Sequence, residues 1–236
     1  MLMRGWSRDI LFGALFVAFA FLSLKSSSDE LPHWLRGTGV APWFSQFTTG
    51  NQSIHDIAVG VIVSLFIYFL VVRLPESDKR RRVRRGLQGH YASFRRGCVQ
   101  VFLEAMKQGY DPALIDGLCD RDEFGRFFRE PFSPGQTRWD AVANGLDPEG
   151  VNGLIIEFDI FRAEIRYALV VVDVESQEIT GFLSRLAGSL YRARSYSCEY
   201  DSVKSLLRLM WSVFTGWDPV DGQSDKDVIA DAIAAM

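Results

Sequence analysis

The chain has 236 residues, of which 48% are hydrophobic and 23% are charged, and this composition excludes a collagen-like, a disulfide-framework and an intrinsically disordered protein. Charge is unevenly divided: residues 1–110 hold 14 Lys and Arg against 7 Asp and Glu, whereas residues 111–236 hold 12 against 22. The cysteines Cys98, Cys119 and Cys198 form no CxxC pair and are odd in number, so we expect reduced thiols.

Two uncharged apolar segments, residues 10–24 and 57–72, predict membrane-spanning helices. They hold 15 and 16 residues. Roughly 20 residues cross the hydrocarbon core, so we expect neutral neighbours and a snorkelling Lys25 to extend them. A buried core helix is the alternative for both segments, although they are apolar on every face. A signal peptide is the other interpretation of the first, but no A-x-A cleavage pattern follows it, so we expect a retained anchor.

Basic residues predict the orientation of these segments in the membrane. Six of them follow the second segment, namely Lys79, Arg80, Arg81, Arg82, Arg84 and Arg85. The connection over residues 25–56 holds only Lys25 and Arg36, and Arg4 and Arg8 precede the first segment. Because basic residues stay on the cytosolic side, we expect residues 1–76 to form a transmembrane hairpin with both chain termini in the cytosol. The expected location is a membrane, with the bacterial inner membrane as the candidate.

The connection between the two segments is rich in aromatic residues. Trp34, Trp43, Phe44 and Phe47 predict an anchor at the outer membrane interface, where rings with one wet edge are favoured. A surface that contacts a partner or ligand outside the cell is the alternative.

Small residues recur at four-residue spacing within both predicted spans. Ala14 pairs with Ala18, and Gly60 pairs with Ser64. Such pairs let helices approach closely, so they predict packing between spans and a homo-oligomer, for which the helices of residues 151–190 are a second expected contact.

Residues 43–85 combine an aromatic loop, an Asp-Ile-Ala-Val-Gly start to the second span, a Leu-Pro-Glu turn and a basic helix. This order resembles uncharacterised bacterial two-span inner-membrane proteins with a helical cytosolic domain. The resemblance implies the topology and assigns no catalytic residue.

Residues 77–108 predict a basic juxtamembrane helix. Pro75 should end the second span, and Ser77 or Asp78 can cap the helix that follows. Apolar residues recur every three or four positions from Leu87 to Ala105 and form one face. We expect the basic residues 79–85 to lie on anionic lipid headgroups. Nucleic acid is not an expected partner, because the acidic remainder of the chain repels a polyanion.

Residues 109–236 predict an acidic cytosolic domain that is an all-α bundle. Three- and four-residue spacing predicts helices over residues 111–120, 122–130, 137–144, 148–172, 179–190, 201–215 and 225–235, with a break at residues 131–135. Asp173 and Ser176 are good N-caps, so residues 148–190 should form two antiparallel helices. A strand at residues 168–172 is the alternative, because this segment is rich in valine.

No catalytic or metal-binding pattern accompanies these elements. The sequence has no phosphate-binding loop, no GxSxG and no HExxH, and His33, His55 and His90 are scattered. The carboxylates Glu157, Glu164 and Asp173 are interleaved with Arg162 and Arg166, as on a solvated, ion-paired helix face. We therefore expect no catalytic, cofactor-binding or metal site.

These observations favour a membrane-anchored, non-enzymatic adaptor, sensor or regulatory subunit, whose acidic helical domain binds a cytosolic partner protein, with a basic partner as the natural expectation. The alternative is an oligomeric membrane-perturbing effector or small channel that its cytosolic domain triggers. Short spans and small-residue pairs favour this alternative, and the scarcity of polar pore-lining residues opposes it. An enzyme with its site between cytosolic helices is a third interpretation, which no pattern supports.

Overall fold

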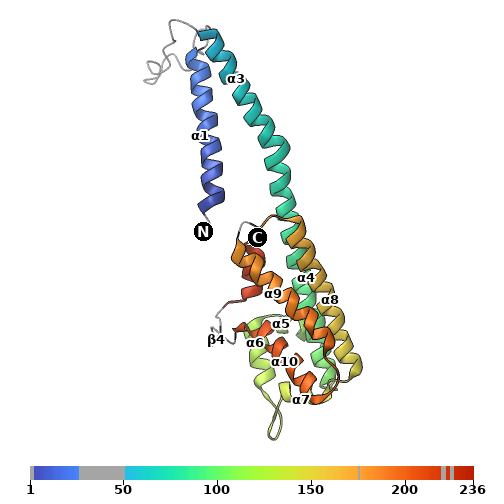
Figure 1. Cartoon of the computed structure of the whole chain (residues 1–236). Helices are drawn as coiled ribbons and strands as arrows, with labels where there is room; N and C mark the ends of the chain where they lie inside the picture. The colour runs from blue at the N-terminus through green and yellow to red at the C-terminus, as the bar shows by residue number, and fades with distance from the viewer. Residues whose placement is uncertain (1–2, 27–50, 175, 219–221, 224–225) are drawn as a thin grey trace. The chain divides into compact units, whose positions relative to one another are not determined.

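The computed structural model describes residues 3–26, 51–174, 176–218, 222–223 and 226–236 (Figure 1). These residues are predominantly helical, with two short hairpins, which confirms the all-α class. The chain divides into two compact units, Met1–Asp78 and Lys79–Met236.

In the first unit, α1 (Met3–Ser26) packs against α3 (Asn51–Tyr68), which continues into the π-helix η2 (Phe69–Arg73). The two helices are antiparallel: the ring of Phe12 stacks on that of Tyr68 with centroids 5.2 Å apart, and at the other end the carbonyl oxygen of Ser23 lies 3.1 Å from His55 Nδ1. The pair is therefore held by ring stacking at one end and by a polar contact at the other.

Only one helix within the described residues is long and apolar enough to cross a membrane, the continuous run Gln52–Ala105. The first predicted span lies in α1, whose apolar part, Ile10–Ser26, is shorter. A membrane-spanning helix is thus weakly indicated, and the two-span hairpin stays a prediction.

The expected helix break at Pro75 is wrong. The helix passes through Pro75 into α4 (Leu74–Ala105), so no separate cap forms at Ser77 or Asp78. Proline removes one N–H donor, and its ring crowds the carbonyl four residues earlier. In the preceding π-helix η2, the Leu74 N–H donates to the Phe69 carbonyl, five residues earlier. This wider turn changes the positions of the backbone carbonyls beside the Pro75 ring.

Among the described residues of the second unit, α4 from Lys79 onward is followed by seven further α-helices: α5 (Ala113–Leu118), α6 (Arg121–Arg129), α7 (Arg138–Gly145), α8 (Pro148–Val171), α9 (Gln177–Arg192), α10 (Tyr200–Thr215) and α11 (Val228–Ala234). A 3₁₀ turn, η3 (Ala193–Ser195), follows α9. The break predicted at residues 131–135 is a hairpin of β1 (Pro131–Ser133) and β2 (Gln136–Thr137), whose turn has Gly135 at φ 79°. A second hairpin pairs β3 (Trp217–Asp218) with β4 (Gly222–Gln223).

Polar side chains cap several of the described helices, including α9 at Ser176, one of the two N-caps that the sequence predicts. Asp120, Asp147, Ser176 and Asp227 each accept a hydrogen bond from a backbone N–H in the first turn of the helix that follows. The strand alternative at residues 168–172 is wrong, because residues 168–171 continue α8. The predicted division into two helices is confirmed, since α8 and α9 are separate and pack against each other.

The core of the second unit is aromatic and centres on α4. Phe94 contacts Phe158 and Phe161 of α8, while Phe102 meets Phe124 of α6 and Phe214 of α10. Residues 87–105 are therefore part of the domain core and not a separate juxtamembrane helix. The compact unit Lys79–Met236 holds 21 Lys and Arg against 23 Asp and Glu, a net charge of −2, so the basic helix largely neutralises the acidic remainder.

Candidate membrane and docking surfaces

The helix α3 and the π-helix η2 expose large apolar side chains around much of their surface. Ile57, Phe66, Ile67 and Val71 are each at least half exposed, whereas Ala58 is fully buried. Monomeric soluble proteins rarely expose so much contiguous apolar surface, so this surface requires a covering of lipid or protein.

The small residues predicted to pack the spans lie outside the α1–α3 contact. Ala14, Ala18, Gly60 and Ser64 are all exposed, and a Cβ added at Gly60 would meet nothing within 4 Å. The Ser64 hydroxyl donates to the Gly60 carbonyl, at 2.8 Å, within the same helix. Their role in contacts between copies stays a prediction.

Six of the basic residues of α4 are clustered near its start, between Lys79 and Arg85. Lys79, Arg81, Arg82 and Arg85 are exposed, and Arg80 and Arg84 are half-buried. Arg84 Nη1 donates to the carbonyl of Ala234 at 3.3 Å, so one of the six also holds the end of α11. The expected contact of this group with lipid headgroups stays a prediction, and the aromatic anchor Trp34, Trp43, Phe44 and Phe47 lies outside the described residues.

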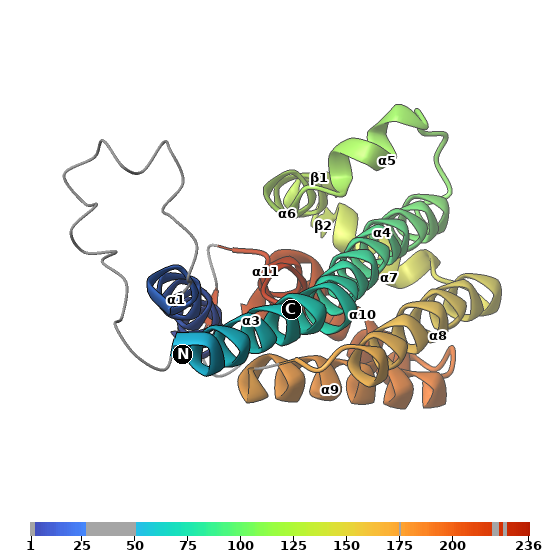
Figure 2. The same ribbon diagram turned by 90° about the horizontal axis from the view of Figure 1, so that it is seen from above.

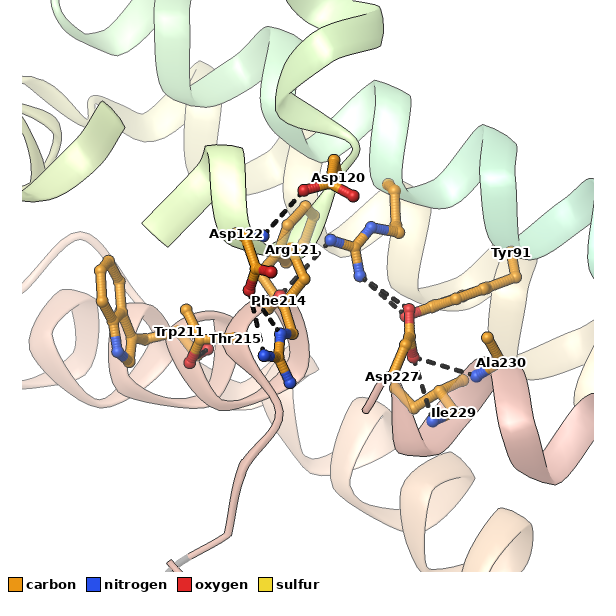
Figure 3. Close-up of polar contacts among 11 residues, drawn as sticks. Tyr91, Asp120, Arg121, Asp122, Trp211, Phe214, Thr215, Asp227, Ile229 and Ala230 are labelled. Atoms are coloured by element: carbon orange, nitrogen blue, oxygen red, sulfur yellow. Dashed lines mark hydrogen bonds and ion pairs between the residues drawn. The ribbon is translucent and has the colours of Figure 1, made fainter. Parts of the chain in front are cut away.

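A buried polar network joins α4, α10 and α11 (Figure 3). Arg95, whose exposed fraction is 4%, donates from Nη1 to the Tyr91 hydroxyl at 3.0 Å and to Asp227 Oδ2 at 3.1 Å. The Tyr91 hydroxyl donates to the same carboxylate at 2.9 Å. Arg95 Nη2 also donates to the Phe214 carbonyl at 3.4 Å, and its guanidinium lies 4.6 Å from the Phe214 ring.

This network holds the start of α11 against the core. Asp227 Oδ1 accepts from the backbone N–H groups of Ile229 and Ala230, so one carboxylate pairs with a buried cation and caps a helix. Burial raises the pKa of the Tyr91 hydroxyl, and the phenol remains a neutral donor. The arrangement locks tertiary structure and offers no free base or nucleophile. Sequence inspection missed it, because the only signal was the four-residue spacing of Tyr91 and Arg95.

A groove of about 690 Å³ lies between α6, α7 and α10. Trp139, Trp211 and Tyr200 line it together with Arg129, Lys204 and Arg208. A second groove of about 500 Å³ lies beside α6, where Arg121 pairs with Asp122 at 3.0 Å, near Thr215 (Figure 3). Both grooves are lined by carboxylates as well as cations, with Asp140 in the first and Asp122 and Glu130 in the second.

The carboxylates predicted to form a solvated, ion-paired face on α8 differ in how exposed they are and in which residues they contact. Glu157 is half-buried, and desolvation raises the pKa of its carboxyl group. Glu164 lies 3.7 Å from His90 Nε2, and Arg162 pairs with Asp159 at 3.4 Å. Within the described ranges, no group of three or more His, Cys, Asp or Glu side chains could hold a metal ion.

Comparison with protein-family models, with curated proteins and with solved structures finds no match for this chain. The functional argument therefore rests on the residues and on the geometry described above.

Proposed function

We propose that this protein is a membrane-anchored, non-enzymatic adaptor, sensor or regulatory subunit whose helical domain binds a partner protein at the cytosolic face. The observation that carries the proposal is the continuous helical run Gln52–Ala105. It exposes apolar residues between Ile57 and Leu74, continues through the basic residues 79–85, and ends in the domain core at Phe94 and Phe102. One helix thus joins a segment suited to lipid to a folded domain.

The finer topology belongs to the same proposal. We infer that α1 and α3 form a two-span hairpin in a bacterial inner membrane, with both termini and the domain in the cytosol and the basic residues 79–85 on anionic headgroups. Cys198 is exposed and reports the side on which the domain lies. A membrane-impermeant maleimide should label Cys198 in inverted vesicles and not in intact spheroplasts. Labelling in spheroplasts would contradict this orientation.

Partner binding is tested by crosslinking and affinity purification of the full-length protein from native membranes. The comparison variant should lack residues 79–236, because a cut at residue 110 would remove the domain from α4, which carries much of its core. A specific cytosolic protein that is captured by the full-length protein and lost with residues 79–236 would support the adaptor. Self-association alone, retained by residues 1–78, would favour the membrane-perturbing alternative and contradict the adaptor.

A further inference from the structure

The larger of the two grooves beside α6 combines aromatic rings with cations. It lies between α6, α7 and α10 and has a volume of about 690 Å³, which is within the usual range of binding clefts. Figure 2 shows α6 on the side of α4 opposite α8 and α9. One face of α10 forms a wall of the groove, which is lined in turn by Tyr200, Lys204, Leu207 and Trp211.

The apolar part of this groove is fixed by the domain core. Val203 and Leu207 are buried. The Trp139 ring packs edge-to-face against that of Phe102, with centroids 5.2 Å apart, and lies 5.1 Å from the Trp211 ring. Both indoles are half-buried and still line the groove. Because packing already holds these rings in place, a ligand would bind here at little cost in conformational entropy.

Three exposed cations, Arg129, Lys204 and Arg208, stand at the rim of the groove. None of them makes an ion pair within the parts of the chain that the structure describes. The Arg129 guanidinium lies 5.4 Å from the centre of the Trp211 ring. Lys204 Nζ lies 5.9 Å from the centre of the Tyr200 ring. The rim therefore carries positive charge that the described residues do not pair.

Asp140 is the only carboxylate among the described lining residues. Its Oδ2 accepts hydrogen bonds from the Thr137 hydroxyl at 2.6 Å and from the Thr137 backbone N–H at 2.9 Å, so it is engaged at the start of α7. Three cations against one carboxylate leave the lining with a net charge of +2. The smaller groove differs, because there Arg121 is paired with Asp122 at 3.0 Å.

We propose that this groove binds an acidic peptide segment of the partner protein, with a large apolar side chain of that segment against the indoles and its carboxylates at the rim cations. Trp, Tyr and Arg are the residues enriched at the energetic centres of protein interfaces, and Arg forms strong paired hydrogen bonds with carboxylates. This assignment rests on the proposed function. It reverses the basic partner expected from the acidic composition of residues 109–236, because a partner meets the charge of one surface and not that of the whole sequence.

A single-stranded nucleic acid is the competing ligand for an aromatic, cationic groove, because its bases stack on exposed rings. Here Arg129 and Lys204 already lie over two of the rings. The net charge of −2 over Lys79–Met236 also repels a polyanion. A short segment with a few carboxylates meets only the local charge of the groove, so the charges favour a peptide.

The experiment is photo-crosslinking of the full-length protein in its native membrane, with p-benzoylphenylalanine in place of Tyr200, which is 72% exposed. The same replacement at Tyr191, an exposed residue of α9, is the matched control. Mass spectrometry of the adduct identifies the attached peptide. The site at Tyr200 should attach a partner protein through a peptide that carries a net negative charge and a large apolar residue, and the site at Tyr191 should not.

Charge reversal tests how this segment is held. Lys204→Glu combined with Arg208→Glu should lower the yield of the adduct about tenfold, because two exposed ion pairs are lost. Arg185→Glu combined with Arg192→Glu makes the same change of charge at exposed residues of α9 and should leave the yield unchanged. Lysines in place of the carboxylates of the attached segment should restore the adduct of the first variant. All four residues are exposed, so thermal unfolding of both variants should be unchanged.

Three outcomes would overturn the proposal: an attached peptide that is basic or neutral, a nucleic acid, a lipid or a second copy of this chain attached in its place, or an adduct that survives the charge reversal at Lys204 and Arg208. Capture of a cytosolic partner is scored separately on the same membranes. A captured partner that gives no adduct at Tyr200 contradicts only the groove. The absence of any captured partner contradicts the adaptor and the groove together.

Discussion

Replacing Asp227 by Asn tests whether the buried network holds the C-terminal helix. Asparagine keeps the size of the side chain and can still cap α11, so the change chiefly removes the negative charge opposite Arg95. Breaking a fully buried ion pair costs about 3–5 kcal/mol, because one charge is left uncompensated. The Asp227 side chain is 28% exposed, and water offsets part of that cost. We therefore expect a loss of about 2 kcal/mol in the free energy of unfolding.

For a domain of this size, that loss lowers the Tm by about 4–8 °C. The assay is thermal unfolding of the full-length protein in detergent, with hydrogen exchange over Val228–Ala234 as the local measurement. Asp231→Asn, at an exposed residue of the same helix, is the matched control and should change stability by less than about 0.5 kcal/mol. Equal effects of Asp227→Asn and Asp231→Asn, or unchanged exchange in α11, would refute the reasoning.

Three further predictions concern packing and titration in the domain. Gly145→Ala should lower the free energy of unfolding by about 1–3 kcal/mol, because the added Cβ would collide with the α4 backbone. Gly89→Ala is the matched control: its Cβ meets nothing, so it should raise the free energy of unfolding by up to about 1 kcal/mol. Denaturant unfolding measures both. Glu157→Gln should raise the Tm at pH 7. Desolvation raises the folded-state pKa of Glu157, so its ionised form is destabilising, and the gain should vanish once acid protonates the carboxyl group; a gain that persists in acid would contradict this. Maleimide at pH 7 should modify Cys198 first and Cys98 only on unfolding, as peptide mass spectrometry will show, because Cys98 is fully buried and burial raises its thiol pKa.

Local signals in the sequence account for much of the helical domain. Apolar spacing predicts α8, α9 and α10, and Asp147 and Ser176 mark helix starts because their side chains bond to nearby backbone N–H groups. These interactions connect residues only a few positions apart, so a single sequence reveals them.

The contacts that sequence inspection misses join distant positions or depend on tertiary context. Asp227 meets Tyr91 across 136 residues, and no local pattern marks that pairing. The continuation of the helix through Pro75 depends on the π-helix before it, which the apolar composition of residues 57–72 does not reveal. The exposure of Ile160 and Tyr167 on α8 is also missed, because apolar residues on both sides of a helix do not show which side α4 and α9 cover.

The balance of charge over Lys79–Met236 has a consequence for electrostatics. The domain carries many ionised groups, but its net charge is only −2. An anionic bilayer would therefore repel the domain as a whole only weakly. Its charges are segregated along the sequence, with eight of the 21 cations between Lys79 and Arg96. An anionic surface would therefore attract the start of α4, where residues 79–85 are clustered, more strongly than the domain as a whole. For the membrane anchor proposed above, added salt would screen this attraction and leave the covalent link through α4 intact.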